Sequence, residues 1–128
     1  MILSRTAILQ AMNKGLLTIS PLDDSQIDKA HIDLHLGGTE DLVIPAKGFV
    51  VARTLEHITL SDNLIGFLEG RSGLAQQGIS VEQGSTLVEP GSDGTMALEI
   101  FNASDTAVSL KAGQPIAKFY LAKLTDTL

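Results

Sequence analysis

The sequence contains no cysteine and no tryptophan, and tyrosine occurs only once. The absence of cysteine excludes disulfide bonds, thiolate catalysis and the common zinc sites that use cysteine ligands. It is compatible with a reducing compartment. Hydrophobic residues still make up 44% of the chain, which is enough for a core, and the scarcity of aromatic residues predicts that this core is aliphatic.

Long apolar runs and positive charge are also scarce. No run approaches the roughly 20 apolar residues that a membrane-spanning helix needs, and the first residues show no secretory signal. We therefore expect a soluble, cytoplasmic protein with no membrane partner. The net charge of −6 argues against a general nucleic-acid-binding function, because phosphate backbones require a basic surface. A small anionic ligand, bound by a few local cations, is still compatible with this charge.

The 128 residues are predicted to form one domain, residues 1–128, which begins with an amphipathic helix at residues 4–14. Ser4 is a suitable N-cap because its hydroxyl can accept a hydrogen bond from a free backbone N–H. Gly15 is a suitable end for the helix. The apolar face of this helix consists of Ile8, Leu9, Ala11 and Met12.

Short strands separated by turns follow the helix. We expect extended segments at residues 16–19, 31–36, 42–44, 48–54, 64–69, 79–81, 86–89, 95–102, 107–110 and 116–124. A single helical turn is expected within residues 70–77, and tight turns at 45–48 and 112–115. This succession of short strands predicts an all-β barrel or sandwich with one leading helix.

The segment His-Ile-Asp-Leu-His-Leu at residues 31–36 alternates strictly between polar and apolar residues. On a strand, His31, Asp33 and His35 would share one face. Imidazole and carboxylate groups are good metal ligands, so this face is one candidate for a metal site. The alternative, which we favour, is a polar face that is solvated or hydrogen-bonded. His57 is isolated in the sequence and is expected to be exposed.

Arg71, Ser72 and Gly73 lie where a strand is expected to give way to a helical turn. An arginine side chain, a hydroxyl and free backbone N–H groups together can bind a phosphate. The alternative is an arginine that stabilises the turn by donating hydrogen bonds to backbone carbonyl groups. The residues by themselves do not favour one of these interpretations over the other.

Glu99 is the carboxylate of the strand predicted at residues 95–102, and alternation places it on one face with Ala97 and Phe101. A carboxylate among apolar neighbours is suited to general acid–base catalysis near neutral pH. The alternative is an edge strand on which Glu99 is solvated. From these residues alone, the solvated edge strand is the favoured interpretation.

Five segments of the chain resemble, in order, segments of the dCTP deaminase and dUTPase superfamily. They are MILSRTAILQAMNKG, HIDLHLG, EGRSGLAQQGI, EPGSDGTMALEIFN and KAGQPIAKFYL. The first resembles the leading helix of dCTP deaminases, which most dUTPases lack, and the second their Ser-x-Asp-Leu-x-Leu-Gly strand. The third matches the shared Arg-Ser-(Gly/Ser)-Leu motif. The fourth is similar to the Asp-Pro-Gly hairpin and Leu-Glu-Phe-x-Asn strand of the deaminases, and the fifth to the shared Pro-Gly-x-x-Ile-(Ala/Gly) turn.

The resemblance implies a distorted β jelly-roll or barrel subunit of the dUTPase type, in a homotrimer with active sites at subunit contacts. It implies that Arg71, Ser72 and Gly73, together with Lys118, bind the triphosphate of a deoxynucleoside triphosphate. Glu99 would be the proton shuttle that activates water for attack on C4 of cytosine. The chemistry would need no cofactor, and Mg²⁺ would only accompany the triphosphate. The zinc-dependent deaminases are excluded because their metal sites require cysteine.

The resemblance also implies that Gln76, Ser85 and Glu89 contact the nucleoside, but several positions depart from the family pattern. Gln76 replaces a second arginine, and Glu89 replaces the aspartate of the hairpin. One extra methylene at position 89 would displace the carboxylate by about an ångström, which is enough to lower a rate. The other departures are Glu82 for a histidine, Ser92 for an aromatic residue and Lys118 for a glutamine.

We expect the C-terminal arm of the deaminases, and the glycine-rich fifth motif of dUTPases, to be missing, because the sequence ends at Leu128. Without such a lid, water would be less completely excluded from the site. Three functions follow from the residues and the resemblance. The first is a dCTP deaminase that forms dUTP, the second is a dUTPase with Glu89 orienting water, and the third is a non-catalytic trimeric relative with a binding, regulatory or structural role.

Overall fold

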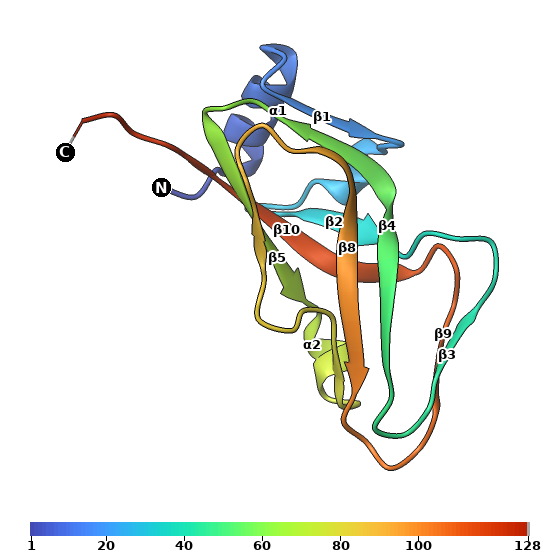
Figure 1. The fold of residues 1–128 in the computed structure, drawn as a ribbon. Helices are drawn as coiled ribbons and strands as arrows, with labels where there is room; N and C mark the ends of the chain where they lie inside the picture. The colour runs from blue at the N-terminus through green and yellow to red at the C-terminus, as the bar shows by residue number, and fades with distance from the viewer. Residues whose placement is uncertain (128) are drawn as a thin grey trace.

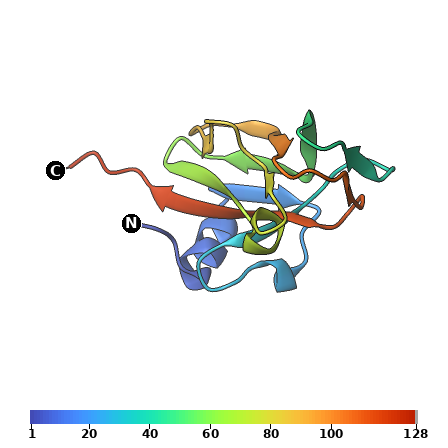
Figure 2. The same cartoon turned by 90° about the horizontal axis from the view of Figure 1, so that it is seen from below.

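Two four-stranded antiparallel sheets pack face to face, with a helix at one end (Figures 1 and 2). This computed structural model describes residues 1–127. The helices are α1 (Arg5–Asn13), the 3₁₀ helix η1 (Asp24–Gln26) and α2 (Ser72–Ala75). The strands are β1 (Leu17–Ser20), β2 (Ile32–His35), β3 (Leu42–Ile44), β4 (Phe49–Leu60), β5 (Leu64–Gly70), β6 (Ile79–Ser80), β7 (Leu87–Val88), β8 (Asp93–Asn102), β9 (Val108–Leu110) and β10 (Pro115–Lys123).

One sheet has the strand order β1-β4-β8-β6 and the other β2-β10-β5-β7, while β3 and β9 form a separate two-stranded ribbon. Figure 1 shows this ribbon at the end of the molecule farthest from α1. The mainly β architecture with one leading helix confirms the prediction from the sequence. Within residues 1–127, no helix combines the length and apolar character needed to cross a bilayer.

The leading helix forms for the reasons that its sequence suggests. The Ser4 hydroxyl accepts a hydrogen bond from the backbone N–H of Ala7 at 3.3 Å, and Gly15 follows the helix with a φ of 74°. Ile8 and Ala11 are buried against the core. Leu9 was predicted to lie on the same apolar face, and this prediction is wrong because Leu9 is exposed. The face of the helix that the core covers is narrower than the set of apolar residues in its sequence.

The core between the sheets is almost entirely aliphatic. Within residues 1–127, Phe119 is the only aromatic side chain of the buried core, and the other large buried side chains are leucine, isoleucine and valine. These side chains come from alternate positions of the strands, so the opposite positions point away from the core. The polar residues discussed below therefore lie mostly on the two outer faces.

The strand predicted at residues 48–54 is longer in the structure, because β4 continues to Leu60. Its second half alternates as well, with Glu56, Ile58 and Leu60 buried. The prediction ended too early because a charged residue, Glu56, occupies a core-facing position, which hides the alternation. The burial of Glu56 is explained by its partners, described below.

A β-bulge divides the two halves of β4. Arg53 pairs with Ala97 and His57 pairs with Thr95, so three residues of β4 face one residue of β8. The hydroxyl of Thr54 closes the bulge, donating to the carbonyl of Glu56 and accepting from the N–H of Met96, both at 2.9 Å. At the bulge the carbonyl of Arg53 accepts a hydrogen bond from the N–H of Gly37 at 2.9 Å.

Gly66 gives a direct test of the packing between β5 and β10. A Cβ atom at this position would lie 2.4 Å from Cε1 and Cζ of Phe119, which is fully buried. We expect Gly66→Ala to lower the free energy of unfolding by about 1–3 kcal/mol, because the ring cannot move without disturbing the core. Urea unfolding measures this change. Gly73→Ala is the matched control, since a Cβ there meets no atom within 4 Å and should leave stability nearly unchanged.

Candidate functional site

The turn after β5 carries the Arg-Ser-Gly residues singled out in the sequence. Arg71 has an extended backbone and is the N-cap of the short helix α2. Its carbonyl accepts hydrogen bonds from the N–H groups of Leu74 and Ala75 at 3.1 and 3.0 Å, and Leu74 is buried. The buried leucine and these hydrogen bonds hold Ser72 and Gly73 at the surface, where both are exposed.

Two adjacent hollows lie beside this turn. The larger, of about 550 Å³, is lined by Phe67, Glu69 and Tyr120 among others. The smaller, of about 350 Å³, is lined by residues that include Arg71, Gly73 and Gln114. Ser72 and Lys118 line both hollows. The structure thus brings together the four residues predicted to bind phosphate, Arg71, Ser72, Gly73 and Lys118.

Two roles were considered for Arg71: binding a phosphate, and stabilising the turn by donating to backbone carbonyl groups. The structure shows a third contact. Nη1 of Arg71 donates to Oδ1 of Asp33 on β2 at 2.8 Å, so its partner in the structure is a carboxylate and not a backbone carbonyl. A guanidinium group has five N–H donors, and this bond uses one of them. The remaining donors are compatible with an anion in the smaller hollow.

The three polar residues at positions 31, 33 and 35, on and just before β2, separate into two groups. His31 joins the arginine pair, since its Nε2 lies 3.1 Å from Oδ1 of Asp33. His35 instead lies with its Nδ1 2.7 Å from Oε2 of Glu56, and its backbone N–H donates to Oε1 at 2.8 Å. The side chain of Gln26 donates to the same carboxylate at 3.1 Å. Within residues 1–127, no group of three or more His, Cys, Asp or Glu side chains could hold a metal ion.

Glu56 is a structural residue that the sequence analysis missed. It is 1% exposed and connects β4 to β2 through the hydrogen bonds just described. A signal was present in the sequence, because Glu56 alternates in register with Ile58 and Leu60 and so occupies a core-facing position. A carboxylate at such a position needs buried donors.

Lys118 lies between carboxylate-bearing residues of the neighbouring strands. On β10 it is the cross-strand partner of Asp33 on one side and of Glu69 on the other. Within residues 1–127, neither carboxylate lies within ion-pair distance of the Lys118 ammonium group. A half-buried cation that lines both hollows without such a pair is suited to an anionic ligand.

Glu99 does not lie on an edge strand, so the solvated-edge interpretation is wrong. Its strand, β8, runs between β4 and β6, and its backbone N–H donates to the carbonyl of Val81 at 2.9 Å. Its Oε1 accepts a hydrogen bond from the N–H of Gln83 at 3.3 Å. On the other side its cross-strand partner is Val51, which is exposed. The carboxylate is therefore half-buried beside an apolar neighbour, and its catalytic role stays a prediction.

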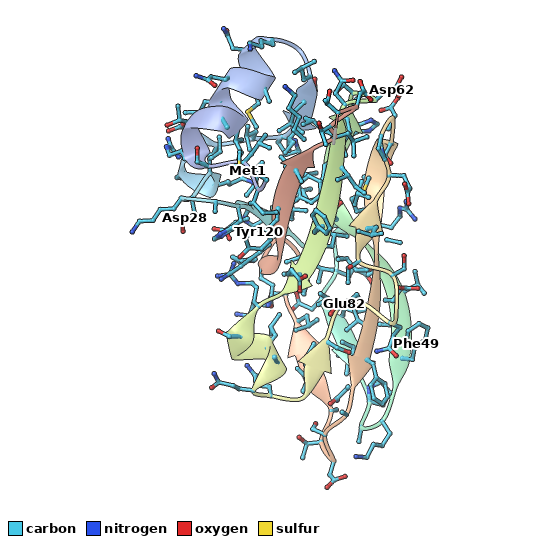
Figure 3. The ribbon with its side chains drawn as sticks, turned by 90° about the vertical axis from the view of Figure 1, so that its left-hand side faces the viewer. Met1, Asp28, Phe49, Asp62, Glu82 and Tyr120 are labelled. Carbon is cyan, nitrogen blue, oxygen red and sulfur yellow. The ribbon has the colours of Figure 1, made fainter. Side chains whose placement is uncertain are left out.

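Glu99 and the phosphate-binding residues lie on different sheets of the sandwich. Glu99 points outward from the sheet that contains β4 and β8, whereas Lys118 points outward from the sheet that contains β10. Figure 3 shows the two outer faces on opposite sides of the molecule, with Phe49 marking the first and Tyr120 the second. Glu99 lines neither of the two hollows. A single chain therefore does not enclose a ligand between these two groups of residues.

The residues expected to contact the nucleoside also lie outside the two hollows. Gln76 is exposed at the end of α2, and Ser85 and Glu89 are exposed in or beside the connections around β7. The carbonyl of Glu89 accepts hydrogen bonds from the N–H and the hydroxyl of Ser92, which closes the hairpin turn. Within residues 1–127 these three side chains form no hydrogen bond. Gln76 stays at the Arg71 turn, since its backbone N–H donates to the carbonyl of Ser72 at 3.0 Å, whereas Ser85 and Glu89 lie beside β7.

His57 is exposed as predicted, but it is not isolated. Its Nε2 lies 2.5 Å from Oδ1 of Asp93 on β8, and the Thr59 hydroxyl donates to the same oxygen at 2.9 Å. These hydrogen bonds lower the pKa of Asp93 below its usual value. The pairing was not visible in the sequence because it depends on the register between β4 and β8.

Comparison with known proteins supports a specific family. A family model described as dCTP deaminase-like matches residues 38–124. A dUMP-forming dCTP deaminase of Sulfurihydrogenibium sp. (strain YO3AOP1) is 32% identical over 155 residues, which cover 98% of this chain and 86% of that protein. A dCTP deaminase of Thermomicrobium roseum is 33% identical over 160 residues, which cover 98% of this chain and 81% of that protein.

Solved structures agree on the fold. A 2′-deoxycytidine 5′-triphosphate deaminase from Agrobacterium tumefaciens has a TM-score of 0.77 at 17% identity, covering 97% of this chain and 48% of that one. A native dUTPase of EIAV has a TM-score of 0.69 at 20% identity, covering 88% of this chain and 92% of that one. At these identities the likeness shows the fold alone, and the fold is the dUTPase-like one expected from the sequence.

Proposed function

Because this chain belongs to the dCTP deaminase-like family, we propose that it is a nucleotide enzyme that converts dCTP and water to dUTP and ammonia. The observation that carries the proposal is the meeting of Arg71, Ser72, Gly73 and Lys118 at one hollow. An arginine, a lysine, a hydroxyl and free backbone N–H groups can together bind a triphosphate. Mg²⁺ would enter with the triphosphate as part of the substrate.

In this proposal Glu99 is the general base and then the general acid. Its carboxylate takes a proton from water, and the resulting hydroxide forms a bond to C4 of the cytosine ring. The protonated carboxyl next gives this proton to N3 of the ring, which leaves a hydroxyl and an amino group on C4. Glu99 then transfers the hydroxyl proton to the amino group, and the C4–N bond breaks as C4=O forms and ammonia leaves. The hydrogen bond from the Gln83 N–H would orient the carboxylate during these transfers.

The proposal requires more than one copy of the chain, since the phosphate-binding residues and Glu99 point away from each other within one protomer. A homotrimer, in which the Glu99 face of one copy covers the Lys118 face of the next, would complete each site. The Glu99 face is suited to such a contact because apolar side chains surround the acid. Phe49, Val51 and Leu55 are 55%, 57% and 45% exposed on it.

Val51→Asp tests this assembly. Val51 is the cross-strand partner of Glu99, so an aspartate there would place a second negative charge in the proposed interface, where it would be desolvated. We expect the wild-type protein to sediment with three times the 13.5 kDa chain mass and the variant to sediment as a monomer.

Val43→Asp is the matched control for this experiment, because Val43 is exposed to a similar extent but lies on the separate β3–β9 ribbon. It should leave the assembly intact. A wild-type protein that is monomeric at all concentrations, or a Val51→Asp variant that remains fully assembled, would contradict the proposed interface.

Product analysis tests the proposed reaction. The purified protein is incubated separately with dCTP and with dUTP, and ammonia, pyrophosphate and nucleotides are measured. Ammonia and dUTP from dCTP would support the proposal. Neither product from either nucleotide, together with no nucleotide binding by calorimetry, would instead indicate a non-catalytic relative.

A second candidate is the dUMP-forming reaction, and the first relative described above carries that name. In that case the protein would release both ammonia and pyrophosphate from dCTP. Glu89, exposed at the hairpin after β7, would then be the candidate for orienting the second water. A Glu89→Gln variant that still releases ammonia but no pyrophosphate would favour this candidate.

A further inference from the structure

Glu82 has an environment that neither the fold nor the proposed mechanism explains. It lies in the connection between β6 and β7, where the chain passes from one sheet to the other. Its Oε2 atom is buried and has no hydrogen-bond partner among residues 1–127. A buried carboxylate oxygen without a donor is unfavourable, so such a group needs a specific reason to be retained.

The connection is held by Glu99 on both sides of Glu82. The carbonyl of Val81 accepts from the backbone N–H of Glu99 at 2.9 Å, and the N–H of Gln83 donates to the Glu99 carboxylate at 3.3 Å. Any displacement of Glu82 therefore changes the hydrogen bond that orients the Glu99 side chain. Figure 3 labels Glu82 near the middle of this side of the molecule.

The side chain of Glu82 turns toward the end of β5. A Cβ atom placed on Gly70 would lie 3.9 Å from its Oε2, and Gly70 directly precedes Arg71. The carboxyl group thus fills the space between the Arg71 turn and the segment that orients Glu99. Such a Cβ atom would make only ordinary van der Waals contacts, so the carboxyl group packs against the backbone of Gly70 without a clash.

The charged groups around Glu82 oppose its ionisation. Glu69 on β5 and Glu99 on β8 both carry negative charge nearby, and the cation Lys118 on β10 is the cross-strand partner of Glu69. Burial, then the charge of Glu69 and more weakly that of Glu99, raise the pKa of Glu82 above its ordinary value of 4.5, and a backbone hydrogen bond at Val81 offsets part of this.

We propose that Glu82 is a positioning residue for Glu99 and that it performs this role as a neutral, protonated carboxyl group. When neutral, it occupies the space beside Gly70 without repelling Glu69 or Glu99, and the Gln83 N–H stays on the Glu99 carboxylate. When it loses its proton, three negative charges lie close together and the 81–83 segment moves toward solvent. The consequence for catalysis rests on the proposed function, whereas the consequence for the conformation does not.

Glu82→Gln tests the proposal, because glutamine has the same size and cannot ionise. The raised pKa means that the stability contributed by the neutral carboxyl is complete below pH 4.5 and is lost as the pH rises through the raised value. We therefore expect equal urea midpoints for wild type and variant at low pH, and a higher midpoint for the variant at about pH 8. Glu40→Gln, at an exposed site far from this cluster, is the control for the change in net charge.

Two further measurements report on Glu99. The amide NMR signal of Gln83 should show one pH-dependent step in the wild type and in Glu40→Gln that is absent in Glu82→Gln. With dCTP as substrate, the ratio of the variant's kcat to the wild-type kcat should rise as the pH increases through the raised pKa of Glu82, with KM nearly unchanged. Glu82→Met, also neutral and of similar length, replaces Glu82→Gln if that variant fails to fold.

A midpoint difference that is the same at every pH, or a Gln83 signal that moves equally in wild type and variant, would overturn the proposal. So would a Glu82→Gln variant that loses deaminase activity at all pH values, because that result would require a charged Glu82. If no protein in the series releases ammonia, the proposed function fails, and the midpoint and NMR measurements still decide the protonation state of Glu82.

Discussion

Glu99→Gln is expected to lower the rate of ammonia release from dCTP by a factor of about 10²–10⁴, the usual contribution of a general acid–base group. Glutamine cannot accept the proton from water and return it. The substitution should leave the fold intact, because the amide oxygen can still accept the hydrogen bond from the Gln83 N–H. The loss should fall on kcat and leave KM nearly unchanged, since the phosphate-binding residues are untouched.

Glu40→Gln controls for the change in charge, and circular dichroism with sedimentation confirms that both variants retain the fold and assembly of the wild type. Full deaminase activity in Glu99→Gln would remove the mechanism while leaving the family membership unaffected. Activity that is lost together with the fold would be uninformative, which is why the variant that preserves the Gln83 hydrogen bond is chosen over alanine.

Asn102→Ala is expected to lower the free energy of unfolding by about 3 kcal/mol. Asn102 is fully buried at the end of β8. Its Nδ2 donates to the carbonyl groups of Ile44, Pro45 and Thr106 at 3.1, 3.2 and 2.8 Å. Its Oδ1 accepts from the N–H and hydroxyl of Ser104 at 3.0 and 2.7 Å. Alanine would leave these groups unpaired and create a cavity.

Urea unfolding measures the loss of unfolding free energy in Asn102→Ala. Two further variants test whether this loss comes from the hydrogen bonds of Asn102. Asn102→Asp keeps the shape but turns an acceptor oxygen toward three carbonyl groups, so it should destabilise at neutral pH at least as strongly as alanine. Asn63→Ala removes an exposed asparagine whose side chain forms no hydrogen bond within residues 1–127 and should change stability by less than about 0.5 kcal/mol. Equal, small effects of Asn102→Ala and Asn63→Ala would contradict the structural role of Asn102.

The Asn102 network also separates two roles within one strand. The resemblance to the deaminases rests partly on the Leu-Glu-Ile-Phe-Asn segment, residues 98–102. In the structure Leu98 and Asn102 point into the protein, whereas Glu99 points outward. One segment therefore combines packing residues with the proposed catalytic residue, and the likeness of the whole segment does not distinguish them.

Much of the fold was predictable because its signals are local. The Ser4 cap, the alternation of β2 and β8 and the turn residues between strands each act over a few residues, and the structure confirms them. β4 was predicted too short because the bulge at residues 54–56 and the buried Glu56 depend on β2 and β8. These strands are distant in the sequence, so the alternation of Glu56 with Ile58 and Leu60 was visible but the partners that allow its burial were not.

The sequence by itself determined the aliphatic core, the short-strand architecture, the leading helix and the residue types suited to bind phosphate, because composition and alternation act along the chain. Only the tertiary structure decided how those residues are shared between two outer faces. It paired Arg71 with Asp33, 38 residues away, and it placed Glu99 on the sheet opposite to Lys118. The physical reason is strand register, since the order in which strands pair decides which side chains meet, and no stretch of neighbouring residues encodes that order.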